Sequence, residues 1–203
     1  MKILIGTANP GKLREYRELL ADIPATFVST ADAGLASLEV DESADTFTGN
    51  ALIKARAYAQ ASGLLTLADD SGLAVDALDG APGVHSARYG GNGLDDRGRR
   101  QRLLAALADV PEGQRTARFV CVIALVDPSG EHNETLTEGT VEGRIAFEDR
   151  EGPVGFGYDA VFIPEGYEES FAQLPGSVKH EMSHRGRAAR QMVPVLQRIV
   201  GAD

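Results

Sequence analysis

The chain has 203 residues, 43% of them hydrophobic and 25% charged, which is the balance of a folded globular protein and not of a disordered one. Its formal net charge of −10 argues against nucleic acid as a partner, and its longest unbroken apolar run, Phe119–Val126, is far shorter than the roughly 18 residues of a membrane span. The single cysteine, Cys121, excludes an internal disulfide, and its apolar neighbours indicate a buried small side chain and not a nucleophile. Because the N-terminus lacks a signal-peptide pattern, we expect a cytoplasmic protein.

The N-terminal third predicts a strand, a tight turn and two helices. Residues 2–6 are mostly apolar and form the strand. Asn9 then offers a helix N-cap and Pro10 a first helical position, and apolar residues follow at helical spacing. A second helix is predicted over 46–62, where Gly63 ends it.

The rest of the chain continues to alternate strands with helices. Pro128–Gly130 marks a hairpin turn, which implies a mixed sheet and not a purely parallel one. We therefore expect an α/β protein with a mixed twisted sheet and flanking helices, and residues 1–203 show no linker that would divide them into separate domains. The remaining predicted elements are strands over 64–68, 73–75, 115–126, 131–147 and 158–163, and helices over 94–108 and 184–200, the last with a kink at Pro194.

The first segment that could carry chemistry is GTANPGKL, residues 6–13. A strand that ends in a turn at a helix N-terminus directs backbone N–H groups and the helix dipole at an anion, and Lys12 adds a full charge. The segment almost matches a Walker A loop, but Leu13 stands where that motif needs a hydroxyl for Mg²⁺. A phosphate site is favoured, and an ordinary capped turn is the alternative.

The second segment is LADDSG, residues 67–72. Two adjacent carboxylates after an apolar strand are costly to hold together unless a cation is near. Asp69 and Asp70 would point to opposite faces of an extended strand, so they can face one metal only if the strand has ended. We interpret Ser71 and Gly72 as that end, with an acidic turn lacking a metal as the alternative.

Two further segments could bind a nucleotide. In ESADTFTGNALIKA, residues 42–55, Lys54 lies at the edge of an apolar helix face, where it either covers the apolar surface with its stem or reaches a phosphate. In GPVGFGYDAVF, residues 152–162, Phe156 stands between glycines and could stack on a base. The alternative for this segment is a loop that enters a strand.

A zinc-protease pattern, H-E-x-x-H, begins at His180 and ends at His184. It needs one continuous helix and a third ligand, but neither His nor Glu follows His184. Ser183 also has the character of an N-cap for the last helix, which leaves His180 outside that helix. We therefore reject a zinc site.

Five motifs, in this order, resemble the inosine triphosphate pyrophosphatase family, also called the Ham1 or noncanonical purine NTP pyrophosphatase family, in its bacterial form. The block that begins ADDSGL and continues through GAPG to SARY is specific to that family, and the resemblance covers nearly the whole chain. The motifs are TANPGK (7–12), TFTGNALIKA (46–55), ADDSGLAVDALDGAPGVHSARYGG (68–91), GFGYDAVF (155–162) and SHRGRA (183–188).

This resemblance implies two α/β lobes around a central substrate cleft, a homodimer, and Mg²⁺-dependent hydrolysis of ITP, dITP and XTP to the monophosphate and pyrophosphate, which cleanses the nucleotide pool. Ala8 stands where many members have Gly, which should matter little because Gly11 remains. The implied residues are Thr7, Ala8, Asn9, Pro10, Gly11 and Lys12 for the triphosphate, Glu42 and Asp70 for the metal, Asp70 again as proton acceptor, and Ser71, Phe156, Gly157, Tyr158, Asp159, Lys179, His184 and Arg185 for other substrate contacts, chiefly with the base.

The mechanism that follows is attack of water on the α-phosphorus, with Lys12 and Lys54 beside the phosphate tail. We assign metal binding and proton abstraction to Asp70, with Asp69 in support. Donors from Arg185 or its neighbours would pair with the 6-oxo group of hypoxanthine or xanthine and would face a donor in adenine. The alternatives are a P-loop-like NTPase that releases orthophosphate, a non-catalytic nucleotide-binding module, and a zinc peptidase.

Overall fold

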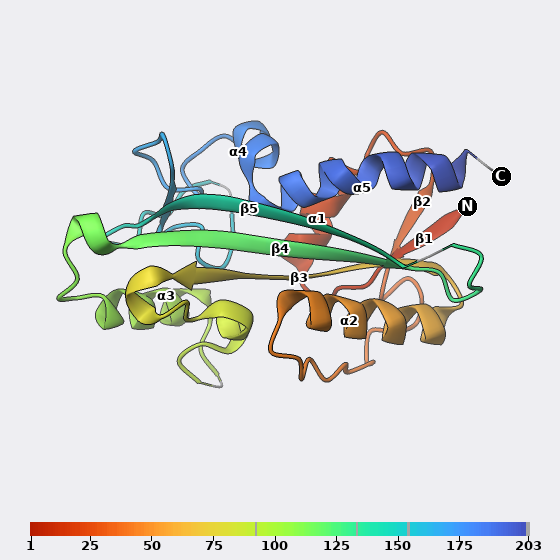
Figure 1. Ribbon diagram of the computed structural model, residues 1–203, viewed down its shortest axis with the longest axis horizontal. Coiled ribbons are helices and arrows are strands. Elements are labelled where there is room, and N and C mark those ends of the chain that lie inside the picture. Colours follow the sequence, from red (N-terminus) through yellow and green to blue (C-terminus); the bar gives the residue numbers. More distant parts are fainter. Residues whose placement is uncertain (92, 133, 154, 202–203) are drawn as a thin grey trace. The chain divides into compact units, whose positions relative to one another are not determined.

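The computed structural model describes residues 1–201 apart from 92, 133 and 154, and it is an α/β protein with one six-stranded sheet (Figure 1). The strands lie in the order β2-β1-β3-β4-β5-β6. Strand β1 pairs in parallel with β2 and with β3, while β5 and β6 are antiparallel, so the predicted mixed sheet is confirmed. The bounds are β1 (Lys2–Ile5), β2 (Thr26–Ser29), β3 (Leu65–Val75), β4 (Thr116–Val126), β5 (Thr135–Ile145) and β6 (Phe162–Pro164).

The helices begin and end at the residues whose local chemistry requires it. Asn9 caps the first helix by accepting from the Gly11 and Lys12 amides at 2.8 and 3.1 Å, and Thr46 caps the second. Gly63 ends the second helix with a left-handed φ of 68°. In the part of the chain that is described, no helix is long and apolar enough to cross a membrane. The helices are α1 (Pro10–Leu19), α2 (Phe47–Ser62), α3 (Asp96–Ala106), α4 (Gly176–Met182) and α5 (His184–Val200), with short 3-10 helices at Asp76–Leu78, Gly83–Arg88 and Glu112–Gln114.

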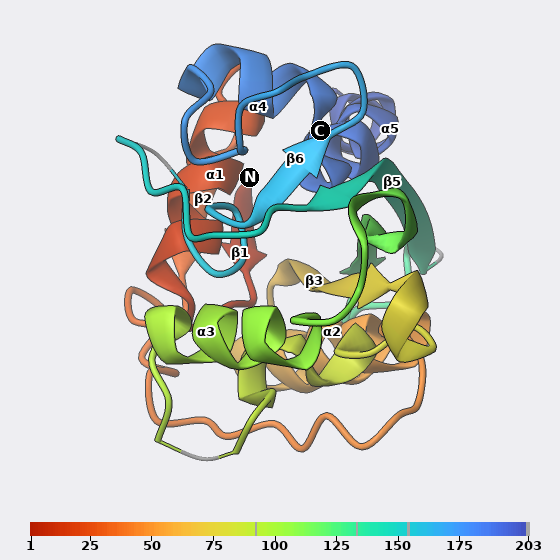
Figure 2. The same cartoon turned by 90° about the vertical axis from the view of Figure 1, so that its left-hand side faces the viewer.

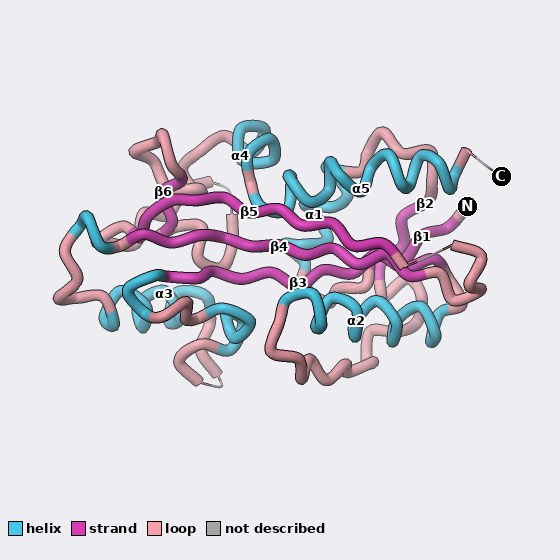
Figure 3. The backbone as a smooth tube through the Cα atoms, viewed as in Figure 1, coloured by secondary structure: helices cyan, strands magenta, loops and turns pink. Residues whose placement is uncertain are grey.

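The chain divides into two compact units. Unit 1 comprises Met1–Asp70, Cys121–Gly139 and Arg185–Asp203, and unit 2 comprises Ser71–Val120 and Thr140–His184. The divisions fall inside β3, β4 and β5, the long strands of Figure 3. Each unit has its own hydrophobic core.

In unit 1, helices cover both faces of the strands: α1 and α5 on one face and α2 on the other (Figure 1). Leu67 of β3 belongs to the core formed with α1 and α5, and the next residue, Ala68, belongs to the core formed with α2. Ala51, Ala55 and Ala59 give α2 a small-residue face that packs closely on the strands. Successive β3 residues therefore alternate between two differently built cores.

In unit 2, α3 and α4 lie on opposite sides of the strands (Figure 2). Three phenylalanines form the centre of this core. The Phe119 and Phe162 ring centroids are 4.7 Å apart, and Phe162 and Phe171 are 5.2 Å apart. These rings contribute a large share of the apolar area that the unit buries.

The prediction of two separate strands over 64–68 and 73–75 is wrong, because β3 is continuous over Leu65–Val75. Ser71 and Gly72 have low strand propensity, but that propensity depends on context and is overridden where the backbone pairs within a sheet. The adjacent carboxylates Asp69 and Asp70 thus lie in the middle of a strand and not at its end.

Three other elements depart from the predictions. The predicted strand over 158–163 forms only at β6, because 158–161 are a turn in which the Asp159 carboxylate accepts from the Phe156 amide at 2.8 Å. The short strand β2 and the short helix α4 were not predicted. Val154, within the glycine-rich segment, lies outside the described residues.

Cys121 lies in β4 and is fully buried in the unit 1 core, as predicted. Its Sγ lies 4.0 Å from the Tyr16 hydroxyl and 3.7 Å from the Asp69 carboxylate. Burial, with the negative charge of Asp69 added, raises the pKa of the thiol to about 12. The thiol therefore stays protonated at neutral pH.

We expect the folded protein to be inert to a thiol-specific disulfide reagent at pH 8, because only a thiolate attacks and this thiol is both buried and protonated. In guanidinium chloride one thiol per chain should react, since the sequence contains a single cysteine. Absorbance of the released chromophore measures both. Rapid stoichiometric labelling of the native protein would contradict the burial of Cys121.

Candidate functional site

The turn between β1 and α1 is fixed by its own hydrogen bonds. The Thr7 hydroxyl accepts from the Asn9 amide at 3.1 Å, and the Thr7 carbonyl accepts from the Thr30 hydroxyl at 3.3 Å. Ala8, Asn9 and Pro10 are exposed. The turn thus presents a preformed helix N-terminus, where the positive end of the helix dipole favours an anion.

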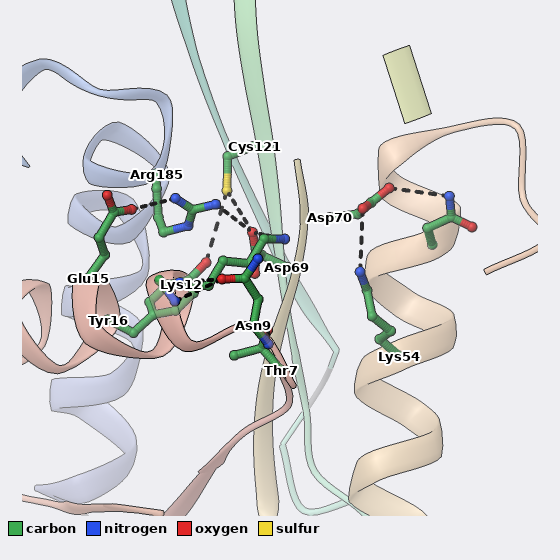
Figure 4. Close-up of polar contacts among 12 residues, drawn as sticks. Thr7, Asn9, Lys12, Glu15, Tyr16, Lys54, Asp69, Asp70, Cys121 and Arg185 are labelled. Carbon is green, nitrogen blue, oxygen red and sulfur yellow. Dashed lines mark hydrogen bonds and ion pairs between the residues drawn. The ribbon is translucent and has the colours of Figure 1, made fainter. Parts of the chain in front are cut away.

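Asp69 is held by cations from α1 and α5 (Figure 4). Its Oδ2 lies 2.9 Å from Lys12 Nζ and 3.3 Å from an Arg185 guanidinium nitrogen. Burial alone raises the pKa of Asp69, but Lys12 and Arg185 outweigh that effect and hold the pKa well below its usual value. Among the described residues its Oδ1 is buried and has no hydrogen-bond partner. Asp69 is therefore a buried, ionised carboxylate with one acceptor oxygen still available.

Asp70 points the other way, toward α2 (Figure 4). Its Oδ1 lies 3.4 Å from Lys54 Nζ, and its Oδ2 accepts a hydrogen bond from the side-chain amide of Asn50 at 3.2 Å. Lys54 Nζ also donates to Glu42 Oε2 at 2.6 Å. Burial raises the pKa of Asp70 above the ordinary value, although Lys54 and Lys12 oppose the change. The Asp70 and Glu42 carboxylates thus converge on one ammonium group.

The expectation that Asp69 and Asp70 face one metal together fails, since β3 continues through both residues. Side chains of neighbouring strand residues point to opposite faces. Asp69 pairs with Lys12 and Arg185, and Asp70 pairs with Lys54. The two carboxylates therefore have separate partners on the two faces of the strand.

Glu42 and Asp70 have the chemistry that a magnesium ion requires. Mg²⁺ prefers oxygen ligands and is commonly held by one or two carboxylates together with phosphate oxygens. The two carboxylates approach the same cation, the Lys54 ammonium, at 2.6 and 3.4 Å, so their oxygens converge on one point. Asn50 supports this arrangement, because its side-chain carbonyl accepts a hydrogen bond from the backbone amide of Ala44, two residues after Glu42. The residues present fit the ion.

Another group of potential metal ligands lies after β4, where atoms of Asp127, Glu131 and His132 come within 4.8 Å of one another. Asp127 already accepts hydrogen bonds from the Ser129 amide and hydroxyl and from the His132 amide. These bonds explain the group as the acidic turn of a hairpin.

Arg185 is almost fully buried and lies between two carboxylates. One guanidinium nitrogen donates to Glu15 Oε2 at 2.5 Å and the other approaches Asp69. Burial lowers the pKa of Arg185, but Asp69 and Glu15 raise it well above the ordinary value. Glu15 was not singled out in the sequence. Its position three residues after Lys12, on the buried face of α1, is the signal that could have found it.

In unit 2, three of the predicted residues form one cluster. The Asp159 carboxylate accepts from the Phe156 amide at 2.8 Å and from Lys179 Nζ at 2.7 Å. Lys179 Nζ also lies 5.3 Å from the centroid of the Phe156 ring, close enough for a cation–π contact. Asp159 and Lys179 are both buried, so the ion pair fixes the turn that carries Phe156.

Tyr158 and His184 of unit 2 contact a backbone carbonyl and an aromatic ring, respectively. Tyr158 donates its hydroxyl to the Ser86 carbonyl at 2.9 Å. The His184 ring stacks on Phe119, with centroids 4.6 Å apart and planes 9° apart, and Phe119 was not identified from the sequence. Ser71, which follows Asp70 in β3, is half-buried.

The zinc-protease pattern is not formed on one helix. His180 lies in α4 and His184 begins α5, with Ser183 in extended backbone between them. Within the described residues, no group of three potential metal ligands includes either histidine. The prediction that His180 lies outside the last helix therefore agrees with the structure.

A pocket of about 190 Å³ opens beside the Phe156 turn in unit 2. Its lining combines the aromatic ring with charged groups. The residues that line it are Arg100, Glu151, Gly152, Gly155, Phe156, Gly157, Asp159, Ala160 and Ala172.

Comparison with known proteins gives a consistent result. The Ham1 family model matches residues 3–195. A relative from Desulforamulus reducens named dITP/XTP pyrophosphatase is 43% identical over 199 residues, which cover 98% of this chain and 97% of the relative. One of the same name from Thioalkalivibrio sulfidiphilus is 45% identical over 198 residues, which cover 97% of this chain and 99% of the relative.

Solved structures agree with the sequence comparison. A HAM1 protein from Coxiella burnetii superposes with a TM-score of 0.86 at 39% identity and covers 98% of this chain and 99% of its own. A nucleoside-triphosphatase, or dITP/XTP pyrophosphatase, from Mycobacterium abscessus gives a TM-score of 0.74 at 44% identity, covering 96% of this chain and 100% of its own. The resemblance found in the motifs is confirmed, and this chain belongs to the Ham1 family.

Proposed function

We propose that this protein hydrolyses noncanonical purine nucleoside triphosphates, namely dITP, XTP and ITP, to the monophosphate and pyrophosphate with the help of Mg²⁺. The names of its relatives support this substrate class. The observation that carries the proposal is the pair of buried carboxylates in β3, Asp69 and Asp70, each with its own lysine, Lys12 and Lys54.

The phosphate tail is assigned to Thr7–Lys12 and to Lys54. A triphosphate is strongly anionic, and this protein is itself acidic, so local positive charge must offset the net repulsion. The N-terminus of α1 lies at an exposed turn, and Lys12, whose side chain is 13% exposed, follows in the first turn of the helix. Asp69 keeps Lys12 in place through their ion pair at 2.9 Å, which is the supporting role given to this carboxylate.

The metal is assigned to Glu42 and Asp70. Bound there, Mg²⁺ would neutralise phosphate charge and polarise the phosphoryl oxygens. Asp70 would also orient the attacking water and accept its proton, and the Asn50 amide holds the second oxygen of this carboxylate in a fixed direction. Positioning and electrostatics suffice for phosphoryl transfer, so no covalent intermediate is required.

The base is assigned mainly to residues of unit 2, with Arg185 added. Phe156 would stack on the purine, with Lys179 and Asp159 holding its turn. His184 and Arg185 would donate to the 6-oxo group, which adenine lacks. Ser71, Gly157 and Tyr158 complete the proposed substrate contacts.

The proposal also includes a homodimer and a cytoplasmic location. The family resemblance implies the first, and the single cysteine with no disulfide suits the second.

The test of the proposed function is to identify the products. With dITP or XTP and Mg²⁺ we expect the nucleoside monophosphate and pyrophosphate in equal amounts, measured by ion-exchange chromatography, and much slower turnover of dATP. Orthophosphate and the diphosphate would instead select the P-loop-like NTPase, while binding without turnover would select a non-catalytic nucleotide-binding module.

Asp70→Asn should lower kcat for dITP by at least about 10³-fold, because it removes a metal ligand and the proton acceptor together. The exposed Asp22→Asn in the same unit is the matched control and should be unchanged. Circular dichroism checks folding, and equilibrium binding of dITP checks that the nucleotide still binds. Near-normal turnover by folded Asp70→Asn protein would remove Asp70 from the mechanism.

Arg185→Ala should lower kcat/KM for ITP, with a rise in activation free energy of about 2–4 kcal/mol, because a buried charged donor to the 6-oxo group is lost. The kcat/KM for ATP should stay nearly unchanged. Arg185→Lys, which keeps one charge between Glu15 and Asp69, should show the same trend with less structural disturbance. Exposed Arg187→Ala is the control. Equal proportional losses for ITP and ATP would show that Arg185 holds the phosphate or the structure and does not read the base.

A further inference from the structure

Two side chains near the start of α3 form hydrogen bonds with the backbone N–H and C=O groups of Gly157. The Asp96 carboxylate accepts from the Gly157 amide at 2.8 Å, and an Arg100 guanidinium nitrogen donates to the Gly157 carbonyl at 3.1 Å. Asp96 and Arg100 are four residues apart, so both side chains project from one face of the helix. Gly157 has a φ of 60°, in the left-handed region that favours glycine.

Arg100 also fixes the segment that leads into this turn. Its Nε donates to Asp149 and its second terminal nitrogen donates to Glu151, each at 2.8 Å. The Arg100 side chain is only 8% exposed. A planar guanidinium can satisfy three acceptors in fixed directions, whereas an ammonium or an amide cannot reproduce that geometry.

The backbone N–H groups on either side of Phe156 Cα, those of Phe156 and Gly157, thereby have different acceptors. Asp159, braced by Lys179, binds the Phe156 amide, while Asp96 binds the amide of the next residue. Arg100, Phe156 and Gly157 also line the same pocket. These hydrogen bonds therefore fix the backbone before and after Phe156, and with it the direction in which the Phe156 side chain points.

We propose that Asp96 and Arg100 are positioning residues that aim the Phe156 ring and thereby set the preference for the purine base. This inference rests on the proposed function, in which Phe156 stacks on the base. Both side chains act through the backbone of Gly157, to which each is hydrogen-bonded. A small displacement of a substrate-binding group is enough to change rates substantially.

The first experiment compares Arg100→Gln and Asp96→Ala with wild type, measuring kcat and KM for dITP, XTP and dATP. Asp96→Ala is the gentler change, since that side chain is 48% exposed. Arg97→Gln, an exposed arginine between them, is the matched control. We expect the dITP-to-dATP ratio of kcat/KM to fall by about 10-fold or more for Arg100→Gln, through KM, and by less for Asp96→Ala.

Phe156→Ala separates this inference from the proposed function. If Phe156→Ala lowers the ratio and neither α3 variant does, the positioning role is overturned and the base contact stands. If Phe156→Ala leaves the ratio intact, the base contact and the positioning role are both overturned, although pyrophosphate release could still hold.

The second experiment needs no turnover. The sequence contains no tryptophan, so Phe156→Trp places a single tryptophan at the turn, which can be excited selectively over the tyrosines. Adding Arg100→Gln or Asp96→Ala to this protein should increase acrylamide quenching of the tryptophan and shift its emission, while adding Arg97→Gln should not. Identical quenching in all four proteins would overturn the inference, and thermal unfolding confirms that each one is folded.

Discussion

The structure of unit 1 depends on two consecutive carboxylates buried in the middle of one strand. A buried charge is strongly unfavourable unless a partner and hydrogen bonds offset its desolvation. Because side chains alternate along β3, Asp69 and Asp70 form their ion pairs with different cations. Asp69 takes its cations from α1 and α5, and Asp70 takes Lys54 from α2. The helices on the two faces are thus tied to the strand by charge as well as by apolar packing.

Much of the fold follows from local sequence. Asn9 with Pro10, and Thr46 with Gly63, mark the ends of α1 and α2 through hydrogen bonds and backbone angles that these residues favour by themselves. The course of β3 does not follow in this way, since Ser71 and Gly72 have weak strand propensity and are extended only because neighbouring strands hold them. The turn over 158–161 is not predicted from the sequence either. Its mostly apolar side chains fit a strand pattern, whereas the hydrogen bond of the Asp159 carboxylate closes a turn.

Some residues of the candidate site can be predicted from the sequence and others cannot. Residues that act through their own charge, such as Lys12, Lys54 and Asp70, can be identified from residue type and local context. Residues that act by holding another side chain cannot, because the partner is remote in sequence: Glu15 and Arg185 are 170 positions apart, and Arg100 and Gly157 are 57 apart. The family resemblance supplies the roles of many residues, but it does not supply these pairings.

The alternation in β3 also limits how the length of the chain can vary. One residue inserted before Asp69 would turn both carboxylates to the opposite faces, so that Asp69 would lie on the side of Lys54 and Asp70 would lie beyond the reach of Lys12 and Arg185. The apolar residues that follow the insertion, such as Leu73 and Val75, would turn away from the core of unit 2 at the same time. We therefore expect insertions and deletions to be tolerated in the exposed turn Pro128–Gly130, whereas a change in the number of residues in β3 should misplace both acids.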